Sequence, residues 1–393
     1  MGQPPLVAVI SNTLTPYRLA LHRRIVRELP QIELWSLFTH GEGDNRWGNR
    51  APADINPVEF GPAEPAVGLH GPRRPLHEWR KGGRMIRWLR DRRAAAVVVL
   101  GYNDPGRLRV LRWCHAHDVP VFLFGDSNVR DDDARARGWR GWLKRRFLPR
   151  VFNWCDGVLT CGSRGVEYFS RYGVPRDRVY LFPYEPDYAA IAAVKSEQIA
   201  AARSRFGLDA RRRHIMFSGR LADQKRVDLL LDAYAAVAPR RPDWDLVIAG
   251  TGPDERALRT RVPAALASRV HWLGFIEDAP TLTALYKACD VLVLPSWFEP
   301  WGVVINEAVA AGLAVVASEA VGSAAELVRD GVNGRIFPVG DVASLGQCLS
   351  DVTRPDRCEQ MKAAAATVLA DWRRRADPVS GLKMALTAAR VTP

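Results

Sequence analysis

Short apolar segments alternate with helix-forming segments through both halves of this 393-residue chain. Strand candidates fall at 6–10, 33–38, 95–100, 119–124, 157–160 and 179–182 in the first half, and at 214–218, 245–249, 270–273, 291–294 and 314–317 in the second. The segment 291–294 is apolar at every position, which is typical of parallel strands covered on both faces. Alternation of such strands with helices predicts an α/β fold with two doubly wound parallel sheets.

The length of the chain and this alternation predict two domains joined by a hinge near residues 184–190. We expect three parts: an N-terminal Rossmann-like domain over 1–186, a C-terminal Rossmann-like domain over 187–370, and a C-terminal helix over 371–393 that returns to the first domain. Residues 40–75 are rich in Gly, Pro and His and predict a long loop region. Residues 359–390 predict a helix with a break at Asp377-Pro378.

The net positive charge is concentrated in the first half of the chain. Residues 1–186 contain 30 Lys and Arg against 19 Asp and Glu, whereas the remainder contains 26 against 24. The first domain is therefore expected to face an anionic partner, and nucleic acid, an acidic polymer and an anionic membrane surface all fit. Two basic segments, 80–93 and 139–148, explain the excess.

In the segment 139–148, one helical face carries Trp139, Trp142, Leu143 and Phe147, with basic residues around it. The segment 80–93 has a similar mix of basic and apolar residues. Each segment can lie on an anionic membrane, or it can pack its apolar face on the first sheet and leave its charges solvated.

The sequence also bears on cellular location. No apolar run is long enough to span a bilayer, and the first residues lack the pattern of a secretory signal. The six cysteines form no CxxC pair and are predicted to be buried, reduced thiols. We therefore expect a cytoplasmic protein, held peripherally on the inner face of the membrane if the basic segments bind lipid.

The stretch 298–312, Phe-Glu-Pro-Trp-Gly-Val-Val-Ile-Asn-Glu-Ala-Val-Ala-Ala-Gly, is the most informative candidate site. It follows an apolar strand candidate and places Glu299 in a loop and Glu307 about one turn into a helix. The amides from Trp301 to Val303 would lie at the N-terminus of that helix, where free N–H groups and the helix dipole favour an anion. A diphosphate held there would leave Glu299 beside its sugar, and Glu307 could accept hydrogen bonds from a ribose diol. The alternative is a strand–helix unit with a capping carboxylate and a solvated glutamate.

A second stretch, Phe217-Ser-Gly-Arg-Leu-Ala-Asp-Gln-Lys225, ends a strand at Gly219 and places Arg220 and Lys225 before a helix at 227–237. Two fixed cations at the carboxyl edge of a parallel sheet can neutralise a leaving diphosphate. Alternatively, they are surface charges around a helix start. A P-loop is excluded, because the sequence contains no GxxxxGK[ST] run.

Taken in order, these stretches resemble the retaining family 4 glycosyltransferases (glycosyl transferases group 1), which have the GT-B fold. The matching motifs cover about residues 214–345 and are, in chain order, Gly219-Arg220…Lys225, Gly250-Thr-Gly-Pro253, Leu273-Gly-Phe-Ile276, Asp290…Pro295-Ser-Trp-Phe-Glu299…Glu307-Ala and Gly331-Val-Asn-Gly334. The two glutamates match the E-x7-E signature of that family. The resemblance implies two Rossmann-like domains that face each other across a cleft and a nucleotide-sugar donor bound by the second.

The resemblance implies the following roles. Gly219 and Gly250 are among the donor-binding residues. Arg220 and Lys225 would hold the diphosphate, Glu307 the ribose, and the backbone near Phe275 and Ile276 the base. Glu299 and the amides of Trp301, Gly302 and Val303 would hold the donor sugar. Glu299, Arg220, Lys225 and Asp126 are the catalytic candidates. Asp126 matches a position where the family often has a residue beside the reacting centre, frequently His. A UDP-sugar is the expected donor and a GDP-sugar the second choice, with no required cofactor or metal ion.

The first domain departs from the common family pattern. Many relatives carry a Gly-rich loop after the first strand, where this chain has Ser11-Asn-Thr-Leu-Thr-Pro-Tyr-Arg18. This resembles a subgroup with Pro-Tyr-Arg, which implies that Tyr17 and Arg18 line the acceptor side. Tyr102 and Asn103 follow a predicted strand whose end points toward the cleft, and with Asn12 they complete the expected acceptor side. The stretch also predicts a helix N-terminus with Thr15 as the cap and Pro16 as the first helical residue. Asp131-Asp132-Asp133 is interpreted as a solvated loop rather than a metal site.

The expected function is that of a retaining hexosyltransferase-type enzyme whose acceptor is a cell-surface glycan or a lipid-linked saccharide. Its expected partners are a nucleotide sugar, that acceptor and an anionic membrane surface. A small-molecule acceptor, as in natural-product glycosylation, is the first alternative. The second is a non-enzymatic protein that binds an anionic polymer or nucleic acid, although the sequence matches no nucleic-acid-binding module. A catalytically silent scaffold is disfavoured because Arg220, Lys225, Glu299 and Glu307 are all present.

Overall fold

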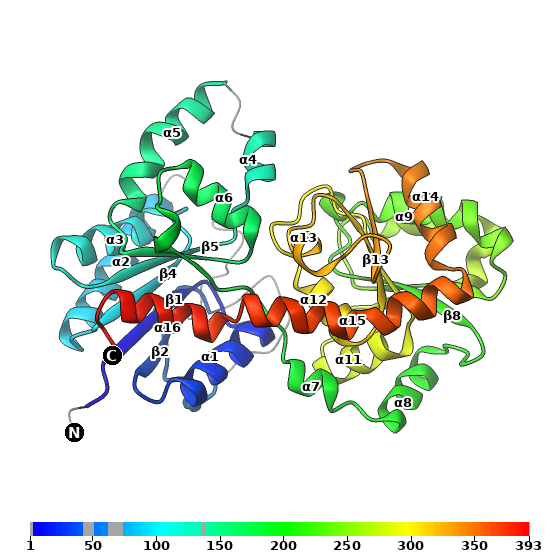
Figure 1. The fold of residues 1–393 in the computed structure, drawn as a ribbon, viewed down its shortest axis with the longest axis horizontal. Helices are drawn as coiled ribbons and strands as arrows, with labels where there is room; N and C mark the ends of the chain where they lie inside the picture. The colour runs from blue at the N-terminus through cyan, green and yellow to red at the C-terminus, as the bar shows by residue number, and fades with distance from the viewer. Residues whose placement is uncertain (1–2, 42–50, 62–73, 136–137, 393) are drawn as a thin grey trace. The chain divides into compact units, whose positions relative to one another are not determined.

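The computed structural model describes residues 3–41, 51–61, 74–135 and 138–392. The chain divides into two compact units, one of Met1–Tyr184 together with Ala376–Pro393 and one of Glu185–Arg375. Each unit contains a parallel sheet flanked by helices, so the predicted α/β fold class is confirmed (Figure 1). The predicted domain boundaries at residues 186 and 370 stay predictions, because these units are defined by packing and not by independent folding.

The first unit contains a seven-stranded sheet in the order β3-β2-β1-β4-β5-β6-β7. Its strands are β1 (Leu6–Ser11), β2 (Glu33–Phe38), β3 (Pro57–Glu59), β4 (Ala96–Leu100), β5 (Val121–Gly125), β6 (Gly157–Thr160) and β7 (Val179–Leu181). Its helices are α1 (Pro16–Glu28), α2 (Arg74–Asp91), α3 (Pro105–Ala116), α4 (Val129–Arg135), α5 (Gly138–Phe152), α6 (Ser163–Arg171) and α16 (Pro378–Ala388). The inner strands are buried along most of their length, which explains their nearly continuous apolar sequences.

The second unit contains a six-stranded sheet in the order β10-β9-β8-β11-β12-β13. Its strands are β8 (Arg213–Ser218), β9 (Trp244–Ala249), β10 (Val270–Gly274), β11 (Val291–Leu294), β12 (Ala314–Ser318) and β13 (Gly334–Phe337). Its helices are α7 (Tyr188–Ala192), α8 (Ser196–Phe206), α9 (Val227–Val237), α10 (Glu255–Arg261), α11 (Ala279–Ala288), α12 (Val303–Ala310), α13 (Ala324–Leu327), α14 (Val342–Val352) and α15 (Pro355–Arg375). These helices include the predicted one at 227–237.

The strand order reverses direction between β1 and β4 in the first sheet and between β8 and β11 in the second. In open α/β sheets, ligands bind beyond the carboxyl ends of the strands at such a switch point. In the second unit, the loops that leave the switch-point strands are those of the two predicted donor motifs. The fold itself therefore brings both motifs to one edge.

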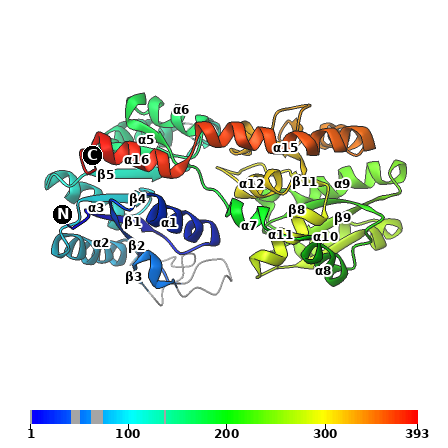
Figure 2. The same cartoon turned by 60° about the horizontal axis from the view of Figure 1, so that its bottom comes forward.

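The last helix, α16, packs on the first sheet although it is distant in sequence (Figure 2). At Gly381 it approaches so closely that a Cβ atom would overlap the carbonyl oxygen of Leu181 in β7. Asp377 caps the start of α16, and its carboxylate lies 2.5 Å from the guanidinium of Arg24 in α1. The predicted helix break at Asp377-Pro378 is confirmed, since α15 ends at Arg375 and α16 begins at Pro378.

The sequence missed two short edge strands. β3 lies inside the segment predicted to be a long loop, which also contains a 3₁₀ turn at Ala53–Ile55. That prediction is therefore wrong for 53–59, while 42–50 and 62–73 lie outside the described residues. β13, the edge strand of the second sheet, has only four residues and contains one glycine and one arginine. Edge strands of this length carry little periodic signal.

Two other predictions concern the whole chain. All six cysteines are buried and unpaired, as predicted. Among the described residues, no helix is both long enough and apolar enough to cross a bilayer.

Candidate nucleotide-sugar site

The candidate site lies at the carboxyl ends of β8 and β11, which are neighbours in the second sheet. The β8–α9 loop carries Arg220 and Lys225, and the β11–α12 loop carries Glu299. The two loops are tied together where the amide of Trp297 donates a 3.0 Å hydrogen bond to the carbonyl of Gln224. The two motifs are therefore adjacent in space.

Lys225 and Glu299 form an ion pair between these loops. Each side chain is only about one-sixth exposed, at 16% and 15%, so the pair is partly shielded from water. Such shielding strengthens the attraction and also makes it costly to leave either charge without its partner. Arg220 is exposed on the same loop. The site thus combines one fixed ion pair with a second, more accessible cation.

A close contact between loops sets the backbone around Arg220. The amide of Gly219 donates to the carbonyl of Ala249 (3.0 Å), and the amide of Leu221 donates to that of Thr251 (2.9 Å). Gly250 has a φ of 138°, and a Cβ atom there would overlap the carbonyl oxygen of Gly219. Only glycine fits this position without strain.

The residue before helix α12 is a glycine in the left-handed conformation, and its lack of a Cβ atom leaves room for the side chain of Glu299. Gly302 has a φ of 89°, and a Cβ atom on it would lie 2.9 Å from Cγ of Glu299. Ser323 holds this turn, because its amide donates to Trp301 (2.8 Å) and its hydroxyl donates to the carbonyl of Gly302 (2.8 Å). The first amides of α12, beginning with that of Val303, precede any intrahelical acceptor and are the donors suited to an anion.

Glu307 lies one turn into α12 and accepts a 2.9 Å hydrogen bond from the hydroxyl of Tyr286 in α11. Burial raises the pKa of Glu307 to about 7, and the bond from Tyr286 offsets only part of this effect. Burial likewise raises the pKa of Tyr286 well above its ordinary value. Glu307 is therefore a carboxyl group with one donor and remaining acceptor capacity, which suits a diol.

The remaining predicted donor residues lie around this centre in different environments. Phe275 and Ile276 follow β10, whose last residue, Gly274, accepts a 2.8 Å hydrogen bond from the amide of Gly250. Ile276 is buried and Phe275 is partly exposed. Trp301 is buried against Trp372 with ring centroids 5.8 Å apart, so its indole belongs to the core and only its backbone is suited to a ligand.

The candidate acceptor residues lie in the first unit, where several follow strands that end at one sheet edge. Asn12 follows β1, Tyr102 and Asn103 follow β4, and Asp126 follows β5. Asn103 and Asp126 are exposed, whereas the hydroxyls of Tyr102 and Tyr168 are hydrogen-bonded at 2.8 Å.

Tyr17 and Arg18 lie in the first turn of α1. The Tyr17 ring packs edge-on to that of Tyr184 at 5.1 Å, and the Arg18 guanidinium donates to the carbonyl of Thr13 at 2.6 Å. Thr15 and Pro16 occupy the predicted N-cap and first helical positions, although the Thr15 hydroxyl makes no capping bond.

Two polar residues that the sequence did not single out support these candidates. Arg107 is buried, donates to Asn12 and contacts Asp104 at 2.7 Å. Tyr286 holds Glu307, as described above. Neither Arg107 nor Tyr286 lies in a recognisable sequence motif. Only the packing of their helices in the structure shows their partners.

The interpretation of Asp131-Asp132-Asp133 as a solvated loop is wrong. The segment belongs to α4, and Asp132 is buried. Its carboxylate lies 2.6 Å from the ammonium of Lys144 in α5 and accepts a 2.9 Å hydrogen bond from the hydroxyl of Tyr172 in α6. These partners are distant in sequence, which is why the local charge run suggested solvent exposure.

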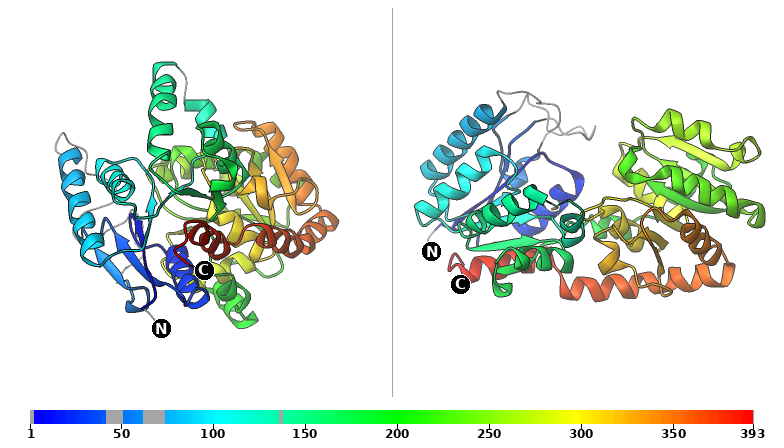
Figure 3. Two further views of the ribbon diagram at one scale, coloured as in Figure 1. Left: turned by 60° about the vertical axis from the view of Figure 1, so that its left-hand side comes forward. Right: turned by 90° about the horizontal axis from the view of Figure 1, so that it is seen from above.

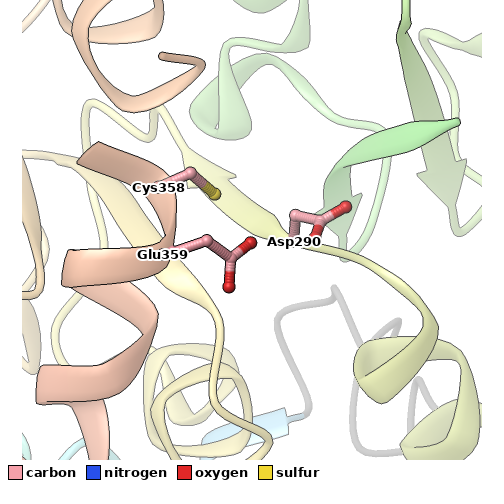
Figure 4. Close-up of side chains that lie close together, drawn as sticks. All are labelled: Asp290, Cys358 and Glu359. Atoms are coloured by element: carbon pink, nitrogen blue, oxygen red, sulfur yellow. The ribbon is translucent and has the colours of Figure 1, made fainter. Parts of the chain in front are cut away.

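In the described residues, one group of side chains is close enough together to hold a metal ion, namely Asp290, Cys358 and Glu359 (Figure 4). The charge of Asp290 is already balanced by cations of the protein. Asp290 accepts from Lys362 at 2.7 Å and from Arg213 at 2.9 Å. Burial raises the pKa of the Cys358 thiol to about 12, which keeps it protonated and a poor ligand. The group lies at the amino ends of β8 and β11, on the opposite edge from the candidate site. It ties α15 to the sheet.

Comparison with known proteins adds independent findings. The family model "Glycosyl transferases group 1" matches residues 212–354, and "Glycosyl transferase 4-like domain" matches residues 34–185. The chain is 38% identical over 209 residues to a lipopolysaccharide core biosynthesis mannosyltransferase, LpsB, of Rhizobium meliloti (strain 1021), a match that covers 50% of this chain and 52% of that protein. It is 35% identical over 153 residues to a phosphatidyl-myo-inositol mannosyltransferase of Mycobacterium leprae (strain TN), covering 38% and 40%. The chain thus spans about half the length, or less, of these relatives.

A solved structure matches the fold over nearly the whole chain. The Anabaena protein Alr3699/HepE, in complex with UDP and glucose, superposes with a TM-score of 0.72 over 98% of this chain and 100% of that one. The sequence identity of 18% supports the shared fold alone.

Proposed function

Because this chain belongs to the family 4 glycosyltransferases with the GT-B fold, we propose that it transfers a sugar from a nucleotide-diphosphate donor to an acceptor hydroxyl with retention of anomeric configuration. The observation that carries the proposal is the convergence of Lys225, Glu299, Gly302 and Glu307 at the switch point of the second sheet. The candidate site therefore contains a cation, a helix N-terminus and a carboxyl group that can accept hydrogen bonds from a diol. A nucleotide sugar presents a diphosphate and a ribose to such groups.

In the proposed complex, the diphosphate accepts hydrogen bonds from the first amides of α12 and from Lys225 and Arg220. The diphosphate competes with Glu299 for the ammonium of Lys225, since the two now form an ion pair. Glu299 is then available to accept hydrogen bonds from the hydroxyls of the donor sugar. As the bond between sugar and diphosphate breaks, negative charge grows on the leaving group, and the two cations and the helix dipole stabilise it. Catalysis then needs no metal ion or cofactor, and full turnover in the presence of a chelator would support this part.

Glu307 is proposed to bind the ribose and the segment around Phe275 the base. The donor is proposed to be a UDP-sugar, with a GDP-sugar second, and the structural neighbour solved with UDP and glucose supports this order. The roles of Asn12, Tyr17, Arg18, Tyr102, Asn103 and Asp126 on the acceptor side stay proposals.

The acceptor is proposed to be a cell-surface glycan or a lipid-linked saccharide. The support comes from two relatives, one named for lipopolysaccharide core biosynthesis and the other for phosphatidyl-myo-inositol. Each match spans about half or less of the relative, so the acceptor must be established by experiment.

The proposal is tested by titrating the protein with UDP- and GDP-sugars in a calorimeter and following turnover of the donor that binds. We expect one nucleotide sugar to bind more tightly than the others and proton NMR of the product to show the anomeric configuration of the donor. If no nucleotide sugar binds, the proposal fails. An inverted product would leave donor binding intact and overturn retention.

A further inference from the structure

Helix α5 presents apolar side chains on two faces. Leu148, Val151 and Phe152 are buried in the core of the first unit. The outward residues recur at the spacing of one helical face, and they are Trp139, Trp142, Leu143 and Phe147, which are 70%, 63%, 50% and 43% exposed. A run of large apolar side chains on one exposed face is unusual for a protein surface and marks a contact site.

The second basic segment behaves differently and serves as an internal comparison. In α2, Met85 and Leu89 are buried in the core, and Trp88 packs on Trp35 with ring centroids 5.3 Å apart. For that segment the apolar face packs on the first sheet, as one of the two alternatives predicted. In α5 the apolar face predicted from the sequence is instead the exposed one, and the helix projects from the first unit (Figure 3).

The charges of α5 are all of one sign. The helix contains five basic residues and no acidic residue. Lys144 turns inward to Asp132, whereas Arg145, Arg146 and Arg150 are exposed. By helical spacing, Arg146 and Arg150 project among the apolar side chains and Arg145 lies at one edge of them. The exposed surface of α5 is therefore both apolar and cationic.

We propose that this exposed face of α5, made by Trp139, Trp142, Leu143, Arg145, Arg146 and Phe147, docks on the surface of an anionic lipid bilayer. A bilayer interface supplies both an apolar layer for the aromatic rings and negative headgroups for the arginines. A second copy of the chain on the same face would place these arginines against one another, which is unfavourable. The helix has 15 residues and five cations, so it lies along the interface and does not cross it.

Docking goes beyond sugar transfer and does not depend on it, because none of these residues belongs to the candidate donor site. It places the first unit against a membrane, where an acceptor with a lipid anchor would be found.

The test measures flotation of the full chain with vesicles of phosphatidylcholine alone or mixed with phosphatidylglycerol. We expect binding only to the mixed vesicles. The variant Trp142→Ser/Leu143→Ser/Phe147→Ser is expected to lose binding even at low salt. Arg145→Glu/Arg146→Glu is expected to weaken it at least about tenfold, since each interfacial cation contributes about fivefold. The matched control Arg87→Glu/Arg90→Glu makes the same change in net charge on α2, and Met384→Ser removes an exposed apolar side chain on α16; both should bind like the wild type.

Fluorescence quenching measures whether the tryptophan rings of α5 enter the bilayer. Brominated lipid is expected to quench part of the tryptophan fluorescence of the wild type, and this quenching should be lost in Trp139→Phe/Trp142→Phe. All variants should unfold at the temperature of the wild type in the absence of any ligand, which shows that they are folded and separates this test from that of sugar transfer.

Several results would overturn the proposal. Wild-type protein that does not float with anionic vesicles is one, and equal loss of binding in the α2 control is another. A wild-type dimer that the serine variant converts to a monomer would assign the face to a second copy. Tighter binding to RNA oligonucleotides than to vesicles, lost in the arginine variant, would assign it to nucleic acid.

Discussion

The candidate site uses its two glutamates in opposite electrostatic settings. Glu299 is paired with Lys225 of the neighbouring loop. Glu307 is partly buried beside the phenol of Tyr286, and desolvation raises its pKa to about 7. The first arrangement keeps a charge ready for exchange with a ligand. In the second, the charged form of Glu307 is poorly solvated, and a ligand that donates two hydroxyl hydrogen bonds would stabilise it.

Exchange of the ion pair for a diphosphate predicts different effects for its two members. Lys225→Ala should raise the dissociation constant of the nucleotide sugar by roughly 10- to 100-fold, because it removes a charge-assisted contact worth about 1.5–3 kcal/mol. Glu299→Gln should mainly lower kcat, because its contact with the sugar is expected to strengthen in the transition state. Calorimetry and steady-state kinetics measure the two effects. Unchanged donor binding and turnover in both variants would remove these residues from the site.

The raised pKa of Glu307 predicts a pH-dependent stability. The folded state keeps its proton between the ordinary carboxyl pKa and about 7, so the protein loses stability as pH rises through this window. Glu307→Gln should therefore raise Tm by roughly 5 °C at pH 8, from a penalty on the order of 2 kcal/mol, and change it little near pH 4.5. The same variant should bind the donor more weakly. A scanning calorimeter decides this, and equal Tm values for variant and wild type at pH 8 would contradict the account.

At the residue scale, the sequence identifies site residues that lie close together in one segment. It does not identify residues that reach the site because distant helices pack together. The two glutamates are eight positions apart on one loop and one helix, which local rules describe. Tyr286 and Arg107 reach their partners from helices elsewhere in the chain, 21 residues and 95 residues away respectively. Local rules do not reveal the burial of Asp132 for the same reason, since its partners are on α5 and α6.

At the scale of elements, the site is built from loops that touch through glycines. The β8–α9 loop, which carries Arg220 and Lys225, rests on the turn after β9 at Gly250. The turn into α12 depends on Gly302. Rigid strands end at one edge, and close backbone contacts fix the loops that leave them.

The contact at Gly250 predicts that a methyl group there damages both fold and function. Gly250→Ala would overlap the Gly219 carbonyl in a strained φ and should cost roughly 2–4 kcal/mol while weakening donor binding. The matched control is Gly346→Ala in α14, where a Cβ atom meets nothing within 4 Å. That change should stabilise the protein by about 0.5–1 kcal/mol. Chemical denaturation and donor titration of both variants provide the comparison, and a Gly250 variant of normal stability and affinity would refute the assigned contact.

Elements with a strong apolar pattern were predictable, and those defined by their neighbours were not. The inner strands and the helix at 227–237 were identified because burial on both faces, or on one helical stripe, leaves a periodic sequence. β3 and β13 lie at sheet edges, where a short strand needs only one partner. For α5, the sequence showed one apolar face, but only the structure shows that the core uses the other.

At the scale of the whole molecule, the two units differ in how the chain builds them. The second unit is one continuous stretch, whereas the first is completed by the C-terminal residues Ala376–Pro393. In α16, Leu382, Ala385 and Leu386 are fully buried. The end of the chain therefore contributes to the core of the unit in which it began.

This arrangement predicts an unequal effect of truncation. Removal of residues 376–393 should destabilise the first unit by about 5 kcal/mol or more, because several buried apolar side chains are lost. Donor binding to the second unit should change much less. Calorimetric scans with and without UDP would show an early transition that is insensitive to nucleotide, followed by one that UDP shifts upward. Loss of UDP binding in a truncated protein whose second transition persists would contradict this prediction.

The most direct measurement of the central claim is a crystal structure of the full chain soaked with a non-hydrolysable UDP-sugar analogue. The account predicts density for the diphosphate at the first amides of α12 and beside Lys225 and Arg220. The ribose should lie within hydrogen-bond distance of Glu307, and the sugar beside Glu299. Density for the nucleotide at any other edge of either sheet, with Lys225 and Glu299 still paired, would contradict it.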